Sequence, residues 1–172
     1  TRFFTEPKQW RDAVVFKYSP QEIKSIEVNY FETPEESFTI TNSDNKFTLT
    51  NVGSTKIIKN VDNTLLNEYV SRYQKIYYEM IDEESSKEKI DSTIASPPYF
   101  SIEVKDFKGG SNKIVGYHMP NFRKILDKDG NEFLFDVDRM YGYLNNELFT
   151  YIQFATFDQL RLPKTYFIKK RS

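Results

Sequence analysis

The residues of this chain that could carry out acid–base chemistry are few. His118 is the only histidine and the chain has no cysteine, so a thiolate nucleophile and a His–His or Cys–His metal site are excluded. Asp136 and Asp138 are paired carboxylates that could work with His118 in a hydrolase. Helix capping explains them better, because a short carboxylate accepts hydrogen bonds from the first amides of a helix. We therefore expect no enzyme and no catalytic residue.

Residues 127–132 are rich in oxygen ligands, as the start of a calcium-binding loop would be. Asp127, Asp129 and Asn131 alternate with other residues, and Asp138 stands where such a loop has its last ligand. The loop needs glycine at its sharp bend and a bidentate glutamate at its end. This chain has Glu132 and Asp138 at those two places. A hairpin turn is the better interpretation, and we expect no metal site and no cofactor.

Two further motifs have simple structural interpretations. Glu35 and Glu36 are paired carboxylates, but they follow Pro34 and are typical of a polar turn. Gly109-Gly110 lacks the partner glycines and the lysine of a phosphate-binding loop. Neither motif indicates a cofactor-binding residue.

The composition excludes some partners and leaves others open. The net charge is −1 and the basic residues are spread along the chain, whereas nucleic-acid binding needs a basic stripe. The run Lys169-Lys170-Arg171 is interpreted as a solvated tail. Aromatic residues make up 16% of the chain, which favours an aromatic core. Neighbouring rings at Tyr77-Tyr78 and Tyr141/Tyr143 keep a glycan platform as an alternative.

The elements that would position these residues are predicted from hydrophobic periodicity. Alternation at period two predicts strands and apolar residues at helical spacing predict helices. We predict strands near 26–30, 38–41, 47–50, 100–105, 114–117, 133–135, 149–154 and 166–169, and helices over 65–80 and 138–144. Asp62 or Asn63 would cap the first helix, and Asp136 or Asp138 the second.

An internal repeat organises these elements. Ser25-Ile26-Glu27-Val28 recurs as Ser101-Ile102-Glu103-Val104, and Val61-Asp62 recurs as Val137-Asp138 at the same offset. We therefore expect an α+β fold made of two tandem βββα modules, with a mostly antiparallel sheet and helices packed on one side. The expected division is a first module with an N-terminal extension over 1–81, a polar linker over 82–96, and a second module with closing strands over 97–172.

The chain resembles the bacterial family called domain of unknown function 4340, in the version carried by Bacteroides-type bacteria. The resemblance spans nearly the whole sequence and rests on short packing motifs. These are Trp10-Arg11-Asp12, Phe16, Tyr18, Pro20, Ile23, Ile26-Glu27-Val28, Ser37-Phe38, Phe47-Thr48-Leu49, Tyr99, Ile102-Glu103-Val104, Asp136-Val137-Asp138-Arg139-Met140-Tyr141, Ile152-Gln153, Phe157-Asp158 and Tyr166-Phe167.

The resemblance implies a location and a setting but no catalytic residue. Such proteins are held in the envelope by an N-terminal hydrophobic segment, and some are associated with an uncharacterised ABC-type transport system. The chain begins at Thr1 rather than at a methionine, and we expect that a signal peptide or an anchoring segment upstream has been removed. A periplasmic or cell-surface location is expected, with contact to the membrane only through that absent anchor.

These observations favour a non-catalytic binding or assembly module with a protein partner in the envelope. The resemblance implies an accessory role in the ABC-type transport system. No nucleic acid is expected as a partner. The alternative is a domain that binds peptidoglycan or a surface polysaccharide. A hydrolase that uses His118, Asp136 and Asp138 is the third hypothesis, and it requires a pocket that joins the three side chains.

Overall fold

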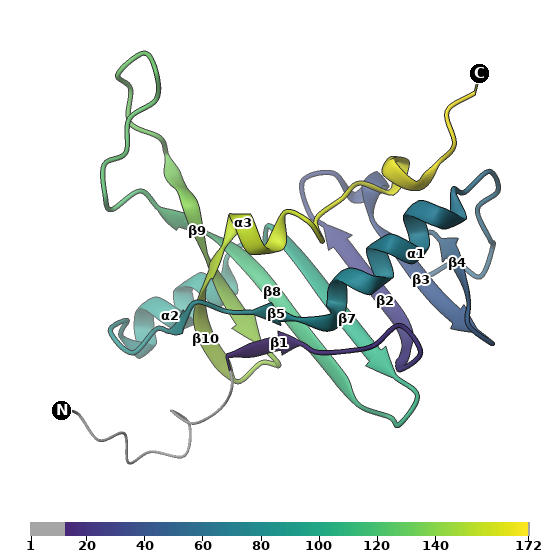
Figure 1. Cartoon of the computed structure of the whole chain (residues 1–172). Coiled ribbons are helices and arrows are strands. Elements are labelled where there is room, and N and C mark those ends of the chain that lie inside the picture. The colour runs from purple at the N-terminus through teal and green to yellow at the C-terminus, as the bar shows by residue number, and fades with distance from the viewer. Residues whose placement is uncertain (1–12, 172) are drawn as a thin grey trace.

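The protein has an α+β fold built on a large antiparallel sheet, seen in a computed structural model that describes residues 13–171 (Figure 1). The strand order in the sheet is β4-β3-β2-β7-β8-β9-β10-β6. The strands are β2 (Ile23–Tyr30), β3 (Phe38–Ser43), β4 (Lys46–Thr50), β6 (Met80–Ile81), β7 (Phe100–Asp106), β8 (Ser111–Pro120), β9 (Phe135–Leu144) and β10 (Leu148–Gln153). Trp10-Arg11-Asp12 of the resemblance and most of the expected N-terminal extension lie outside the described residues.

The two copies of the sequence repeat form neighbouring strands in the middle of this sheet. β2 and β7 pair antiparallel, so that Ile26 lies opposite Val104 and Val28 opposite Ile102. Residues that alternate along a strand point to opposite faces, and these four apolar side chains are all buried. One continuous sheet therefore runs through both halves of the chain.

The helix predicted over 138–144 is wrong, because these residues belong to β9. Met140 and Leu144 face the main core while Tyr141 lies in a second apolar cluster on the other face. β9 lies between β8 and β10, and it pairs with both. Its backbone groups are thus satisfied by the two neighbouring strands, which outweighs the local capping chemistry of Asp136 and Asp138.

The helix predicted over 65–80 is shorter than expected. α1 (Asn63–Ser71) begins after Asp62, whose carboxylate accepts hydrogen bonds from the amides of Thr64 and Leu65, as predicted for a cap. A 3-10 turn, η3 (Arg72–Gln74), ends it. The chain then forms β5 (Ile76–Tyr77), which pairs with β1 (Val14–Phe16) in a two-stranded sheet.

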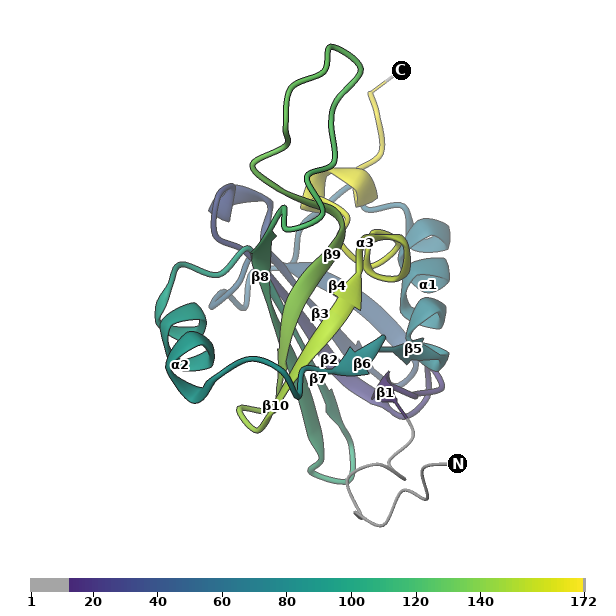
Figure 2. The ribbon, with the colours of Figure 1, turned by 90° about the vertical axis from the view of Figure 1, so that its left-hand side faces the viewer.

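The predicted linker contains a helix that covers the opposite face of the sheet. α2 (Lys87–Ala95) begins after Ser86, whose hydroxyl accepts a hydrogen bond from the amide of Lys89. Figure 2 shows α2 on one side of the sheet, and α1 and α3 (Phe154–Phe157) on the other. The expectation that the helices pack on one side is therefore wrong. The apolar surface of β8, β9 and β10 needs its own cover, which α2 provides with Ile90 and Ile94.

Of the two strands predicted near the C-terminus, one is confirmed and the other is wrong. β10 matches the strand predicted over 149–154. The strand predicted over 166–169 is instead the 3-10 turn η4 (Lys164–Phe167) with one isolated bridge between Val61 and Ile168. Another 3-10 turn, η2 (Pro34–Glu36), precedes β3. Among the described residues, no helix is long and apolar enough to cross a membrane.

The main core lies between the sheet and α1 and is strongly aromatic. Tyr69 of α1 is fully buried beside Phe38 and Phe167, and Tyr73 of η3 is fully buried beside Tyr69. The Tyr69 hydroxyl donates to the carbonyl of Leu160 at 2.7 Å and lies 2.7 Å from the Tyr73 hydroxyl. A buried hydroxyl is costly unless it is hydrogen-bonded, and both hydroxyls meet that condition.

Candidate functional site

His118 of β8 is held in a stack of aromatic rings. Its imidazole lies 4.1 Å from the ring of Tyr99 and 4.4 Å from the ring of Phe135, measured between centroids. Its Nε2 atom is 3.6 Å from a carboxylate oxygen of Glu32. His118 thus contacts two rings and Glu32, whereas Asp136 and Asp138, the other members of the hypothetical hydrolase, bind a different side chain.

Asp136 and Asp138 bind one arginine instead. Arg123 donates to both carboxylate oxygens of Asp136 at 3.0 and 2.8 Å, and its Nη2 also lies 2.8 Å from Asp138. Asp136 further accepts hydrogen bonds from the amides of Asp138 and Arg139. Burial alone would raise the pKa of Asp136, but these hydrogen bonds outweigh it and the pKa lies below its ordinary value. Such a carboxylate is a structural anchor rather than a general acid.

The segment that Arg123 anchors is an extended loop between β8 and β9, residues 121–134, which we call the arm. Figures 1 and 2 show it standing clear of the sheet and the helices. The Asn121 side chain joins the two sides of this loop: its amide nitrogen donates to the carbonyls of Ile125 and Phe133, and its amide oxygen accepts from the backbone nitrogen of Ile125. The arm therefore has a defined conformation at its base.

The tip of the arm is the turn that the sequence predicted at residues 127–131. The Asp127 carboxylate accepts hydrogen bonds from the amides of Asp129 and Asn131, and Gly130 takes a positive φ of 85°. Hydrogen bonding to the Asn131 amide is the main cause that lowers the pKa of Asp127. The hairpin interpretation is confirmed. Within residues 13–171 no three acidic or histidine side chains are grouped as a metal site would require.

The arm exposes apolar side chains to an unusual degree. Leu134 is 78% exposed and Phe122 is 63% exposed, although the Lys89 ammonium of α2 lies 5.0 Å from the Phe122 ring. Leu126 and Phe133 are exposed as well. Scattered apolar residues are normal on a protein surface, but several on one preorganised loop are typical of an interaction site.

A small pocket lies near the base of the arm and has a volume of about 230 Å³. We call it the Arg161 pocket; it is lined by Tyr30, Glu32, Thr33, Glu36, Tyr99, Arg161 and Pro163. Glu36 lies in the 3-10 turn η2, which agrees with the predicted polar turn. Its carboxylate also accepts hydrogen bonds from the amide and hydroxyl of Thr165, a contact that the sequence did not predict. The pocket connects to the arm through the stack of Tyr99, His118 and Phe135.

The aromatic pairs considered for glycan binding do not form exposed platforms. Tyr77 is exposed, but its neighbour Tyr78 is buried. Tyr141 is buried in a cluster with Phe149 and Tyr151, on the sheet face that α2 covers. Tyr143 lies two residues along β9, so it is on the same face as Tyr141 and packs against this covered cluster.

Sequence reasoning missed Arg123, Arg161 and the exposed apolar residues of the arm. The turn signal at residues 127–131 locates the tip of the arm, but nothing in the sequence distinguishes Phe122 or Leu134 from a core residue. The residues of the Arg161 pocket come from distant segments, which carry no common motif. Comparison with protein-family models, with curated proteins and with solved structures finds no match.

Proposed function

We propose that this chain is a non-catalytic binding or assembly module, and that a protein partner binds it through the arm. The observation that carries this proposal is the combination of a fixed backbone and exposed apolar side chains in residues 121–134. A loop that is already ordered loses less conformational entropy on binding than a flexible one. Aromatic and aliphatic anchors of this type supply most of the free energy at interfaces.

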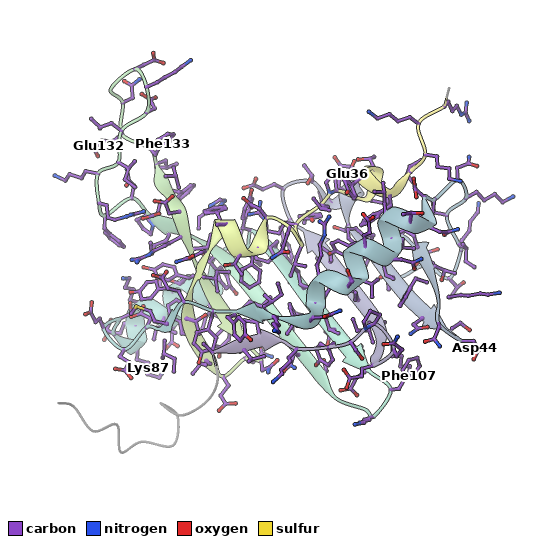
Figure 3. All side chains as sticks on the ribbon, in the orientation of Figure 1. Glu36, Asp44, Lys87, Phe107, Glu132 and Phe133 are labelled. Atoms are coloured by element: carbon purple, nitrogen blue, oxygen red, sulfur yellow. The ribbon has the colours of Figure 1, made fainter. Side chains whose placement is uncertain are left out.

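The distribution of charge on the arm favours a protein partner over a lipid bilayer. The tip carries Asp127, Lys128 and Asp129, and Glu132 follows it, whereas Phe122 and Leu134 lie nearer the base of the arm. Insertion into a bilayer would bury the charged tip first, and charged groups in hydrocarbon are costly. Figure 3 shows Glu132 and Phe133 on the arm, well away from the rest of the protein. A groove on a partner could hold the apolar sides and leave the tip in water.

We also propose an envelope location and an accessory role in an ABC-type transport system, as the resemblance to the domain of unknown function 4340 family implies. Both rest on that resemblance alone. The division at 81 and 97 also stays a prediction. So do the two tandem βββα modules: β2, β3 and β4 are followed by α1, but in the second half β10 intervenes between β9 and α3.

Glycan binding is supported less well than protein binding. A sugar platform needs exposed, neighbouring rings, and Tyr78 and Tyr141 are both buried. The hydrolase hypothesis is also weaker, since Arg123 engages Asp136 and Asp138 while His118 stacks between rings.

Site-specific photo-crosslinking of the full-length protein in its native membrane tests the proposal. A photoreactive amino acid is placed at Leu134 of the arm and, as a matched control, at Phe107, which is 56% exposed at the hairpin between β7 and β8. We expect one protein to be captured in stoichiometric amount from position 134 and not from position 107. The captured protein, once purified, should bind the wild-type chain.

A second pair of variants separates binding from folding. Leu134→Asp should abolish this binding without lowering the melting temperature, because the side chain is 78% exposed. Phe107→Asp should leave binding intact. If Leu134→Asp binds like the wild type, or if only glycan is captured, the arm is not the binding site and the proposal is wrong.

A further inference from the structure

The Arg161 pocket has a positively charged wall built from a nearly buried arginine. The Arg161 side chain is 13% exposed, and its guanidinium lies 4.5 Å from the Tyr99 ring centroid and 5.3 Å from that of Phe100. It donates to the Tyr99 hydroxyl at 3.1 Å. Stacking on aromatic rings and a hydrogen bond fix the plane of the guanidinium, which is the arrangement that suits recognition of a carboxylate.

The charge of Arg161 is only partly compensated within the described residues. Its one ion pair there is with Asp158, at 3.4 Å, and the Asp158 carboxylate is 60% exposed. The Nε atom is buried and makes no hydrogen bond in the described structure. A cation taken out of water is stabilised by additional anionic or hydrogen-bonding partners. A carboxylate bound in the pocket would supply such a partner at the part of the guanidinium that lines the pocket, not at the enclosed Nε atom. The Tyr99 hydroxyl, which accepts from Arg161, has its own proton available to donate.

The same pocket has a negatively charged wall. Glu32 is 67% exposed and touches His118 through only one of its carboxylate oxygens, at 3.6 Å. Glu36 accepts both of its hydrogen bonds from Thr165 at the Oε2 atom. These two carboxylates therefore have acceptor capacity left for an ammonium group, which donates up to three hydrogen bonds.

The remaining surfaces of the pocket limit the size of a ligand. Tyr30, whose hydroxyl donates to the carbonyl of Leu162 at 2.6 Å, and Pro163 contribute apolar wall. The volume of about 230 Å³ is below the roughly 300–1,000 Å³ of sites for drug-sized molecules. A small molecule with one carboxylate and one ammonium would fill it and match both charged walls.

We propose that the Arg161 pocket binds a small amino acid, with the carboxylate at Arg161 and Tyr99 and the ammonium at Glu32 and Glu36. This goes beyond the proposed function, since the site is separate from the exposed side chains of the arm. The protein partner of the arm and the ligand of the Arg161 pocket are tested by different measurements.

Isothermal titration calorimetry on the whole chain tests the pocket with a matched set of probes. Alanine, β-alanine and γ-aminobutyrate carry both charges at increasing separation, butyrate lacks the ammonium, and butylamine lacks the carboxylate. We expect at least one of the amino acids to bind about tenfold or more tightly than both singly charged probes, as is typical for hydrogen bonds to charged groups. If none of them binds, or if butyrate binds as tightly, the proposal is wrong.

Substitutions show which wall of the pocket binds the carboxylate and which binds the ammonium. Glu32→Gln should weaken the amino acid about tenfold and leave butyrate unchanged, because the lost charge faces only the ammonium. Tyr99→Phe keeps the ring beside Arg161 and should weaken butyrate and the amino acid alike. Glu35→Gln is the control, since Glu35 lies in the same 3-10 turn but does not line the pocket. Equal effects of Glu32→Gln and Glu35→Gln would exclude a specific ammonium site. Melting temperatures confirm that each variant is folded.

Discussion

Raising the pH above about 10 should unfold this protein steeply, because two tyrosines of the core cannot ionise in place. Tyr69 and Tyr73 are 0% exposed. Since the Tyr69 hydroxyl donates to the carbonyl of Leu160, its ionisation would lose that bond and place a charge against a carbonyl oxygen. Burial is the main cause that raises the pKa of both side chains well above 10.

The magnitude follows from proton linkage. In the unfolded chain both tyrosines ionise near pH 10, whereas in the folded protein they keep their protons. Below that pH both states are protonated, and these groups add no pH dependence. Above it the folded state binds two more protons, so the free energy of unfolding falls by about 2.7 kcal/mol per pH unit. Tyr30, whose pKa burial also raises, makes the fall steeper. A typical stability of about 5–15 kcal/mol is then lost within a few pH units.

Urea denaturation followed by circular dichroism at a series of pH values from about 9 to about 11.5 measures this slope. Near-ultraviolet absorbance follows tyrosinate formation in the same samples. Tyr73→Phe is the matched variant, because Tyr69 keeps its hydrogen bond to Leu160, and it should reduce the slope by about 1.36 kcal/mol per pH unit. If the variant has the same slope as the wild type, or if all tyrosines ionise while the fold persists, the assignment of the buried hydroxyls is wrong.

Two further predictions concern the centre of the sheet. Ile26→Ala and Ile102→Ala should each destabilise the protein by about 2–5 kcal/mol in denaturant titrations, since both side chains are fully buried; if both are silent, the strand faces are misassigned. Gly116→Ala should cost about 1–3 kcal/mol, because its new Cβ would lie 2.2 Å from a carbon of the Phe100 ring. Adding Phe100→Leu makes room for that methyl group, so the double variant should lose less than the two single losses together; strict additivity would contradict the predicted clash.

The sequence by itself determined the elements whose periodicity and end signals agree. Alternation at period two located β2, β3, β4 and β7, and the short acidic side chain of Asp62 located the start of α1. The turn residues around Gly130 located the tip of the arm. In each case the signal is a short pattern along the chain, whether a period, a capping side chain or a turn, so it can be read from local sequence.

Only the tertiary structure decided that residues 138–144 form a strand, and which residues make up the arm surface and the Arg161 pocket. Val137-Asp138 has the same local chemistry as Val61-Asp62, yet it lies in a strand, because the residues from Met140 to Leu144 that follow it pair with β8 on one side and with β10 on the other. The exposure of Leu134 and the presence of Arg161 and Glu32 in one pocket likewise depend on how distant segments pack. Long-range backbone pairing and burial outweigh local propensity where the two disagree, and no pattern along the chain reports them.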